Sequence, residues 1–204
     1  MIMTEPTEGL RALKKQMTRS AISTAALDLA LEKGLDHVTI EEIAHRAIVS
    51  PRTFSNYFSC KEEAVVAAGN KYWVDLLDQL ADRPLDEHPL QSMRTLLVGA
   101  TRADGAELQR AIRTMRLGRQ SPGLRPFQSA LYSQLEGSLR ATVAARTGSN
   151  LQSDLFPWLV AASAVAAMKS AIMMWLINDL TVADLPDLIA EAFDQLTDGL
   201  RLPA

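Results

Sequence analysis

Residues 39–62 read TIEEIAHRAIVSPRTFSNYFSCKE, and three helix starts lie in this one stretch. At a helix start, a small hydroxyl side chain caps free backbone N–H groups, and a glutamate three residues later or a proline in the first turn strengthens the signal. Each start has this form, in the pairs Thr39 with Glu42, Ser50 with Pro51, and Ser59 with Glu62. The stretch therefore predicts a short helix, a turn, a second short helix and the beginning of a third.

The distance between the first two starts indicates the type of motif. Thr39 and Ser50 are eleven residues apart, which leaves room for about two turns of helix and a turn of roughly three residues, as in a helix-turn-helix unit. We expect apolar side chains to face inward and polar side chains of the second helix to face outward. The inward set is Ile40, Ile43, Ala44, Val49, Phe54 and Phe58, and the outward set is Arg52, Thr53, Asn56 and Tyr57.

The rest of the chain has helical patterns and almost no strand signals. Apolar residues recur at helical spacing, and no Asn-Gly or Asp-Gly turn joins two apolar runs. Glycine and proline breaks separate the segments. The expected helices outside the helix-turn-helix span about 14–33, 59–82, 121–146, 153–178 and 184–201. The sequence thus predicts an all-α fold of about nine helices, beginning with a three-helix unit.

The composition excludes several classes of protein. The chain has 204 residues, of which 48% are hydrophobic and 22% charged, with a net charge of -3. One cysteine and three histidines exclude a disulfide scaffold and a cysteine-rich zinc module, so we expect no metal and no cofactor. No nucleophile elbow, phosphate-binding glycine loop or HExxH pair occurs, so we do not expect an enzyme.

Two segments bear on localisation. Residues 1–18 lack the apolar core of a secretory signal, so we expect a cytoplasmic protein. The apolar stretch 155–177 approaches the length of a membrane span, but it contains Lys169, Pro157 and many small residues. We therefore predict a buried helix there and no contact with a membrane.

The stretch 39–62 and its flanks resemble the TetR family of bacterial transcriptional repressors. The likeness covers residues 14–65 well and the remainder only in layout. The residues that follow the family's signature in order and spacing are Ile43-Ala44, Val49-Ser50, Thr53-Phe54, Asn56-Tyr57-Phe58 and Lys61-Glu62-Glu63. Two positions differ, because the family most often has glycine where this chain has Ile48 and an aromatic residue where it has Ser55. A β-branched residue at positive φ is strained, so Ile48 implies either local strain or a different turn.

The resemblance implies that residues 50–58 form a recognition helix that lies in the DNA major groove. Arg52 can pair bidentately with a guanine edge, Thr53 can meet a thymine methyl or a phosphate, and Asn56 can reach a base edge or the backbone. Thr39, Tyr57 and Lys61 suit phosphate contacts, which fix the register of the protein on DNA. The predicted DNA-binding set is Thr39, Ser50, Pro51, Arg52, Thr53, Asn56, Tyr57 and Lys61.

The charge distribution agrees with this assignment only modestly. Residues 1–61 carry eight Lys or Arg and seven Asp or Glu, whereas residues 62–204 carry 13 and 17, so the net charges are +1 and -4. Arg11, Lys14, Lys15 and Arg19 cluster where the first helix would meet the DNA backbone, although a solvated helix start has the same pattern.

The resemblance also implies two domains, a helix-turn-helix domain at 1–61 and a ligand-binding and dimerisation domain at 62–204. The expected partners are a palindromic operator in double-stranded DNA, a largely apolar small-molecule effector, and a second copy of the chain paired through the last two long helices. Flexible and aromatic side chains suit an adaptable apolar pocket, although ordinary core has the same pattern. The candidate pocket residues are Met93, Leu97, Met115, Phe127, Trp158, Met168 and Trp175.

The function implied is a repressor that leaves its operator when an effector binds. Two alternatives stay open at this point. One is a ligand- or protein-binding module that has lost specific DNA binding, which Ile48 and Ser55 suggest. The other is a transcriptional activator with the same DNA contacts.

Overall fold

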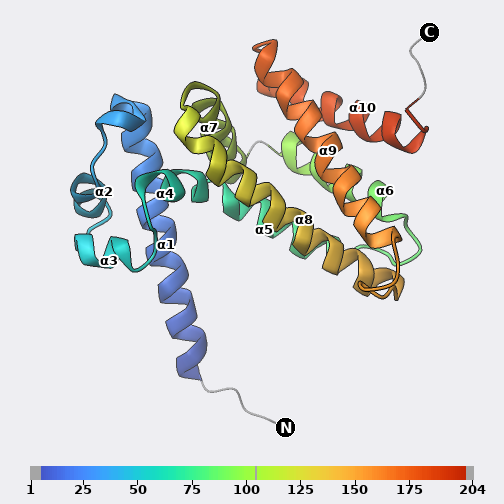
Figure 1. The fold of residues 1–204 in the computed structure, drawn as a ribbon, viewed down its shortest axis with the longest axis horizontal. Coiled ribbons are helices and arrows are strands. Elements are labelled where there is room, and N and C mark those ends of the chain that lie inside the picture. Colours follow the sequence, from blue (N-terminus) through green and yellow to red (C-terminus); the bar gives the residue numbers. More distant parts are fainter. Residues whose placement is uncertain (1–5, 104, 201–204) are drawn as a thin grey trace. The chain divides into compact units, whose positions relative to one another are not determined.

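The computed structural model describes residues 6–103 and 105–200, and within these ranges every regular element is a helix (Figure 1). The α-helices are α1 (Pro6–Lys33), α2 (Ile40–Arg46), α3 (Pro51–Ser55), α4 (Lys61–Ala67), α5 (Asn70–Ala81), α6 (Pro89–Arg102), α7 (Ala106–Gln120), α8 (Arg125–Thr147), α9 (Phe156–Ile177) and α10 (Leu185–Thr197). Three short 3-10 helices, η1 (Leu35–His37), η2 (Pro122–Leu124) and η3 (Val182–Asp184), lie between them. The all-α prediction is confirmed, and the described residues form ten α-helices instead of about nine.

The first compact unit comprises residues 6–70 and 110–128. Its α1 packs against α2 and α4, and α2 packs against α3, so these four helices surround one core (Figure 1). Ile22, Ile43 and Phe54 are fully buried in that core. The inward set expected from the sequence is buried at Ile43, Ala44, Phe54 and Phe58, while Ile40 and Val49 are half-buried.

The second compact unit comprises residues 71–109 and 129–200 of the described chain. In this unit α9 packs along α10, and both of these helices contact α6. Trp175 and Phe193 are fully buried there. The sequence predicted two consecutive domains with one boundary after Lys61. In the structure the first compact unit also includes residues 110–128, so each unit consists of two separate stretches of the chain.

The single helix expected over residues 59–82 is wrong, because the chain breaks it into α4 and α5. Gly69 is buried at the break, and a Cβ atom there would lie 3.1 Å from the Cα atom of Ala111. A side chain at this position would push α7 away by a few tenths of an ångström, so glycine favours this close approach. The break therefore accompanies close packing that sequence periodicity does not report.

Other helix ends also differ from the expected ones. Helix α1 begins at Pro6 instead of about Lys14, and the helix expected from Ser121 opens as η2 before α8 begins at Arg125. The capping box expected for Ser59 uses Glu63 instead of Glu62, because α4 begins two residues after Ser59 and the Glu63 carboxylate accepts the Ser59 N–H at 2.8 Å. Helix α10 ends at Thr197, and the expected end at Arg201 lies outside the described residues.

Helix α9 is long and apolar enough to cross a membrane by length and composition alone. However, 56% of its most apolar window is buried, and the buried side chains include Val160, Met168 and Trp175. The core helix of a soluble protein passes the same test. The packing is therefore that expected of a core helix that leaves one face open.

Candidate DNA interface

Thr39 and Glu42 fix the start of α2. The Thr39 hydroxyl accepts the Glu42 N–H at 3.3 Å, and the Glu42 carboxylate accepts the Thr39 N–H at 2.9 Å, so the predicted capping box forms. Lys33 pairs with the same carboxylate. This ammonium and the Thr39 N–H lower the pKa of Glu42 to about 2, so the carboxylate stays charged at neutral pH.

The turn between α2 and α3 has the strained geometry that the sequence suggests. Ile48 has a φ of 56° and is 93% exposed. The N–H of Val49 donates to the Ala44 carbonyl at 2.9 Å, and the N–H of Ile48 donates to the His45 carbonyl at 3.1 Å. These two bonds form a Schellman motif, in which glycine usually occupies the residue with positive φ. Ile48 therefore keeps the turn and carries local strain.

Replacing Ile48 by glycine should stabilise the protein. A left-handed backbone costs a residue with a side chain roughly 1–2 kcal/mol, and glycine removes this cost. Glycine also makes the unfolded chain more flexible, which lowers the stability of the folded protein by roughly 0.5–1 kcal/mol. We expect Ile48→Gly to raise the free energy of unfolding by about 0.5–1 kcal/mol, measured by urea denaturation. Ala47→Gly is the control, because Ala47 has a φ of -79° and glycine should destabilise that position. Equal effects at both positions would contradict the assignment of strain to Ile48.

Helix α3 is held in place by its N-terminal cap and by one buried side chain, and polar side chains on its other side face solvent. The Ser50 hydroxyl caps the helix by accepting the Thr53 N–H at 3.0 Å, and Pro51 occupies the first turn. Phe54 is fully buried and Arg52 is exposed. The Thr53 hydroxyl lies 2.8 Å from the Ser50 hydroxyl, so its oxygen is already hydrogen-bonded.

The recognition helix expected over residues 50–58 is shorter than predicted. Regular α-helix ends at Ser55, and exposed Asn56 and half-buried Tyr57 lie in the turn that follows. The N–H of Phe58 still donates to the Phe54 carbonyl at 3.0 Å, so the chain keeps helical hydrogen bonding through this turn. Asn56 and Tyr57 thus remain beside the exposed end of α3.

Lys61 does not have the free ammonium that a phosphate contact requires. Its Nζ atom donates to the carbonyl oxygens of Leu35, Asp36 and Val38 at 2.8, 3.3 and 3.0 Å. An ammonium has three N–H donors, and these carbonyls at the end of η1 use them all. The expected phosphate role of Lys61 is therefore corrected to a structural one, in which it ties α4 to η1.

Arg19 is a positioning residue that sequence reasoning placed only in a basic cluster. Its guanidinium donates to the Tyr57 carbonyl at 2.9 Å and lies over the Phe58 ring, 4.3 Å from the centroid. It also lies 3.8 Å from the Glu63 carboxylate. Arg19 thereby holds α1 against the segment that follows α3. In the sequence, its position about one turn before the buried Ile22 could have indicated that Arg19 lies beside the core.

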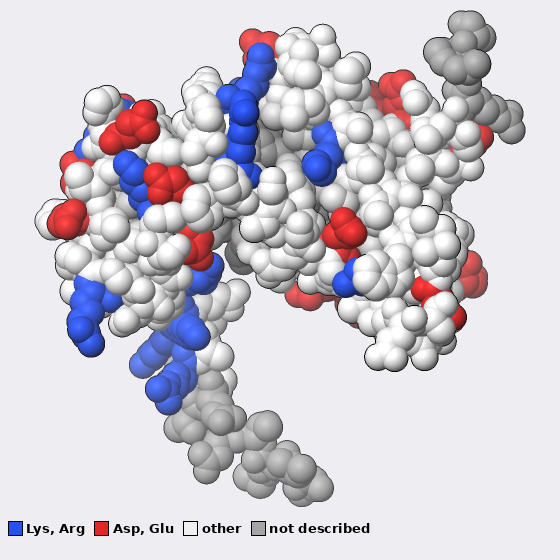
Figure 2. Space-filling model, in the orientation of Figure 1, with Lys and Arg blue, Asp and Glu red and all other residues white. Residues whose placement is uncertain are grey.

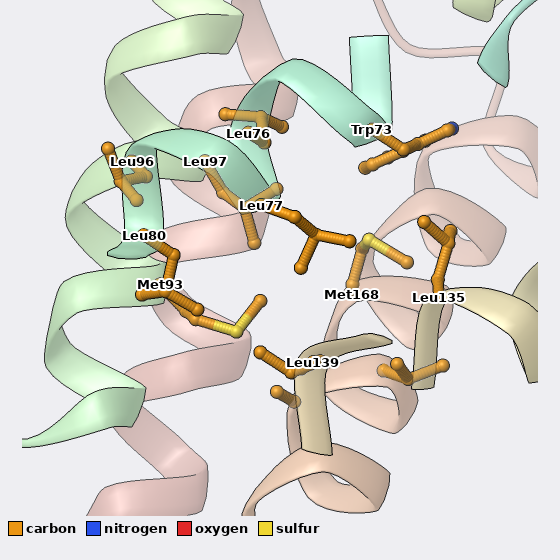
Figure 3. Close-up of a pocket in the computed structure, with 12 residues that line it drawn as sticks. Trp73, Leu76, Leu77, Leu80, Met93, Leu96, Leu97, Leu135, Leu139 and Met168 are labelled. Carbon is orange, nitrogen blue, oxygen red and sulfur yellow. The ribbon is translucent and has the colours of Figure 1, made fainter. Parts of the chain in front are cut away.

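A small cavity lies inside the second compact unit (Figure 3). Its volume is about 40 Å³, and its walls come from α5, α6, α8 and α9. The lining is apolar and consists of Trp73, Leu76, Leu77, Leu80, Met93, Leu96, Leu97, Leu135, Leu139, Ala164, Val165 and Met168. A typical small-molecule site measures roughly 300–1,000 Å³, so a ligand of that size requires the walls to move apart.

Three of the seven candidate pocket residues, Met93, Leu97 and Met168, line this cavity. The other four do not. Trp158 is 45% exposed beneath the Arg140 guanidinium, and Trp175 is fully buried and donates its indole N–H to the Thr181 carbonyl at 2.7 Å. Met115 and Phe127 belong to the first compact unit. The lining residues of α5 were missed as pocket residues, although their helical periodicity is visible in the sequence.

Comparisons with known proteins agree with this geometry. Residues 22–68 match the family described as bacterial regulatory proteins, tetR family, and residues 87–201 match the family described as MftR C-terminal domain. The HTH-type transcriptional regulator TcmR of Streptomyces glaucescens is 32% identical over 203 residues, which cover 95% of this chain and 87% of TcmR.

Two solved structures show the same fold at low identity. SmeT, the repressor of the Stenotrophomonas maltophilia multidrug efflux pump SmeDEF, has a TM-score of 0.58 at 18% identity, covering 91% of this chain and 94% of SmeT. The fatty acid degradation regulator FadR of Bacillus halodurans has a TM-score of 0.59 at 18% identity, covering 91% and 97%. These relatives are regulators and not enzymes, and the chain belongs to the TetR family of bacterial transcriptional regulators.

Proposed function

We propose that this protein is a cytoplasmic repressor that binds a palindromic operator as a dimer and leaves it when a largely apolar small molecule binds the second compact unit. The observation that carries the proposal is the exposed α3, which is capped by Ser50, anchored by buried Phe54 and followed by Asn56 and Tyr57. Figure 2 shows Lys and Arg side chains along the lower part of α1 and beside α3. This surface suits the phosphates on either side of a major groove.

The proposed DNA contacts follow from the side chains that α3 exposes. Arg52 pairs with a guanine edge, and Asn56 reaches a base edge or the backbone. Because the Thr53 hydroxyl is hydrogen-bonded to Ser50, the Thr53 methyl group is the better contact, to a thymine methyl. Tyr57 and Thr39 contact phosphates and fix the register, while Ser50 and Pro51 hold the start of the helix.

The proposed dimer uses the open face of α9 together with α10. Four large apolar side chains of α9 are more than half exposed, and small residues lie between them on the same side of the helix. These residues are Leu159, Met173, Met174 and Ile177, with Ala162 and Ala166 between them. An exposed apolar row of this length favours a protein interface, and a two-fold dimer places two copies of α3 at half-sites about 34–36 Å apart.

The proposed effector site is the apolar cavity among α5, α6, α8 and α9. Because the cavity is smaller than a typical ligand, an effector would bind a form in which these helices have moved apart. DNA and effector then favour different forms of the protein and oppose each other, with a coupling free energy of roughly 1–3 kcal/mol. The apolar lining is the reason for proposing a largely apolar effector.

The proposal competes with a module of the same fold that has lost specific DNA binding. Ile48 was the main reason for that alternative, and the backbone keeps the turn despite the isoleucine. The activator alternative requires the same DNA contacts, and transcription from the neighbouring promoters in a deletion strain separates it from repression.

The test is fluorescence anisotropy of the purified protein on its own upstream intergenic DNA and on a scrambled duplex, between 50 and 200 mM salt. We expect tighter binding to the upstream DNA, a stoichiometry of one dimer per site and a steep loss of affinity as salt rises. Equal affinity for both duplexes at every salt concentration would overturn specific DNA binding.

A further inference from the structure

Tyr72 on α5 has a buried hydroxyl group that makes no hydrogen bond within the part of the chain that the structure describes. The residue is 7% exposed, and its ring lies edge-on to that of Trp73, with 5.0 Å between the two ring centroids. Burial raises the pKa of Tyr72, so the hydroxyl keeps its proton at neutral pH and remains a donor. Buried polar groups are nearly always hydrogen-bonded, because a buried hydroxyl without a partner destabilises the fold. A hydroxyl in this state is available to a ligand that brings a hydrogen-bond acceptor.

Tyr72 adjoins the row of α5 side chains that line the apolar cavity. Trp73, Leu76 and Leu80 belong to the lining (Figure 3). Tyr72 precedes Leu76 by four residues, which places it about one turn away on the same side of the helix. The lining as it stands does not include Tyr72. A ligand that widens the cavity along α5 toward the beginning of this helix would therefore approach Tyr72.

Arg146 of α8 fixes the other end of the cavity. Its guanidinium donates to the carbonyls of Leu80 and Pro84 at 2.7 and 2.8 Å, and to the Ser92 hydroxyl at 3.3 Å. These bonds tie the end of α5 and the beginning of α6 to α8, so three of the four cavity walls are held together there. Leu80 lies eight residues after Tyr72, or about 12 Å along the helix. The walls can therefore move apart more easily at the Tyr72 end than at the Arg146 end.

We propose that the Tyr72 hydroxyl donates a hydrogen bond to a neutral oxygen atom of the effector, such as a carbonyl oxygen, when the cavity widens beside Trp73. The proposal rests on the proposed effector site and defines the chemistry of its ligand, which is an apolar body that carries a neutral acceptor. A carboxylate or a phosphate fits less well, because the twelve lining residues include no cation and an unpaired buried charge is very costly. A hydrocarbon also fits less well, since it would leave the hydroxyl unpaired.

The first test measures the stability of the free protein. Tyr72→Phe removes a buried hydroxyl that has no partner, so it should raise the equilibrium constant for folding roughly 5-fold or more, measured by urea denaturation. Tyr132→Phe is the matched control, because it removes the same group from a half-buried tyrosine of α8 in the same compact unit, and it should not raise this constant. If Tyr72→Phe lowered the constant instead, the hydroxyl would already have a partner in the free protein, such as a bound water, and the proposal would be wrong.

The second test uses two probes of the same shape on the full chain. In 2-acetylnaphthalene a carbonyl oxygen stands where 2-isopropenylnaphthalene has a CH₂ group, and calorimetric titration gives a dissociation constant for each. The ratio of the two constants measures the preference for the ketone and cancels changes in packing that affect both probes. This preference should fall roughly 10-fold in Tyr72→Phe and stay that of the wild type in Tyr132→Phe.

The outcomes separate this proposal from the one on which it rests. If the wild type bound both probes and Tyr72→Phe kept the same preference, the hydrogen bond would be wrong and the effector site would stand. An equal fall of the preference in both tyrosine variants would contradict the assignment to Tyr72. Tighter binding of 2-naphthoate than of the ketone would overturn the neutral acceptor, because it would require a cation in the site. Failure of the wild type to bind either probe up to its solubility limit would overturn the apolar effector site and this proposal together.

Discussion

Arg52→Ala is expected to lower operator affinity roughly 5- to 150-fold, which corresponds to about 1–3 kcal/mol for one bidentate contact to guanine. Arg52 is exposed on α3, whose position depends on buried Phe54 and on the Ser50 cap. Removing its side chain should therefore leave the free energy of unfolding nearly unchanged. Anisotropy measured on a set of operators with single base changes would show relaxed preference at one position of each half-site.

Two further variants separate base recognition from charge. Arg52→Lys keeps the charge but loses the planar pair of donors, so it should lose base preference while retaining most of the salt slope. Arg46→Ala removes an arginine from the neighbouring helix α2, where Arg46 pairs with Glu32 at 2.8 Å, and it should leave base preference intact. If Arg52→Ala weakened operator and scrambled DNA by the same factor, Arg52 would be a phosphate contact and its assigned role would be wrong.

Local signals in the sequence predicted the helix-turn-helix well because its determinants are local. The capping box of Thr39, the Ser50 cap and the buried positions of Ile43 and Phe54 involve residues within a few positions of one another. The strain at Ile48 was also predictable, because the sequence has isoleucine at the position of the turn where a positive φ favours glycine. Short-range chemistry thus accounts for most of this motif.

The parts that the sequence did not predict depend on contacts between distant residues. Lys61 looked available for phosphate, but its ammonium is held by carbonyls of residues 35–38. The helix break at Gly69 coincides with close packing of Ala111 on α7. Arg146 donates to the carbonyls of Leu80, Arg83 and Pro84, more than sixty residues earlier, and so fixes the end of α5. No local pattern announces such partners.

The candidate pocket shows the same limit. Methionine and tryptophan were predicted to line the pocket because of their residue type. However, Trp158 lies on the surface, and Trp175 is buried in the core and does not line a cavity. The cavity is instead lined by side chains of four helices that meet in space, and most of these side chains are leucines of α5, α6 and α8. Residue type indicates which side chains suit an apolar pocket, whereas only the packing of helices decides which of them meet.

Ala166→Glu is expected to raise the dissociation constant of the proposed dimer at least about 100-fold, which corresponds to about 2.7 kcal/mol. Ala166 is exposed on α9 between Leu159 and Met173, so glutamate fits the folded monomer without burial. Across a two-fold axis the new carboxylates of both protomers would approach each other in an apolar surface, and close like charges cost several kcal/mol. Operator affinity should fall with the dimer, because one α3 reads only a half-site.

Sedimentation analysis at micromolar protein would measure this loss, with anisotropy on the operator as the second readout. Ala130→Glu is the matched control, since Ala130 is an exposed alanine on α8, outside the proposed interface, and this variant should remain dimeric. If both variants kept the wild-type dimer mass, the dimer would use a surface other than α9. If the wild type itself were monomeric at this concentration, two half-sites could not be read together, and a palindromic operator would lose its physical basis. A monomeric Ala166→Glu that still bound the operator with wild-type affinity would show that a single α3, with the contacts around it, suffices for recognition.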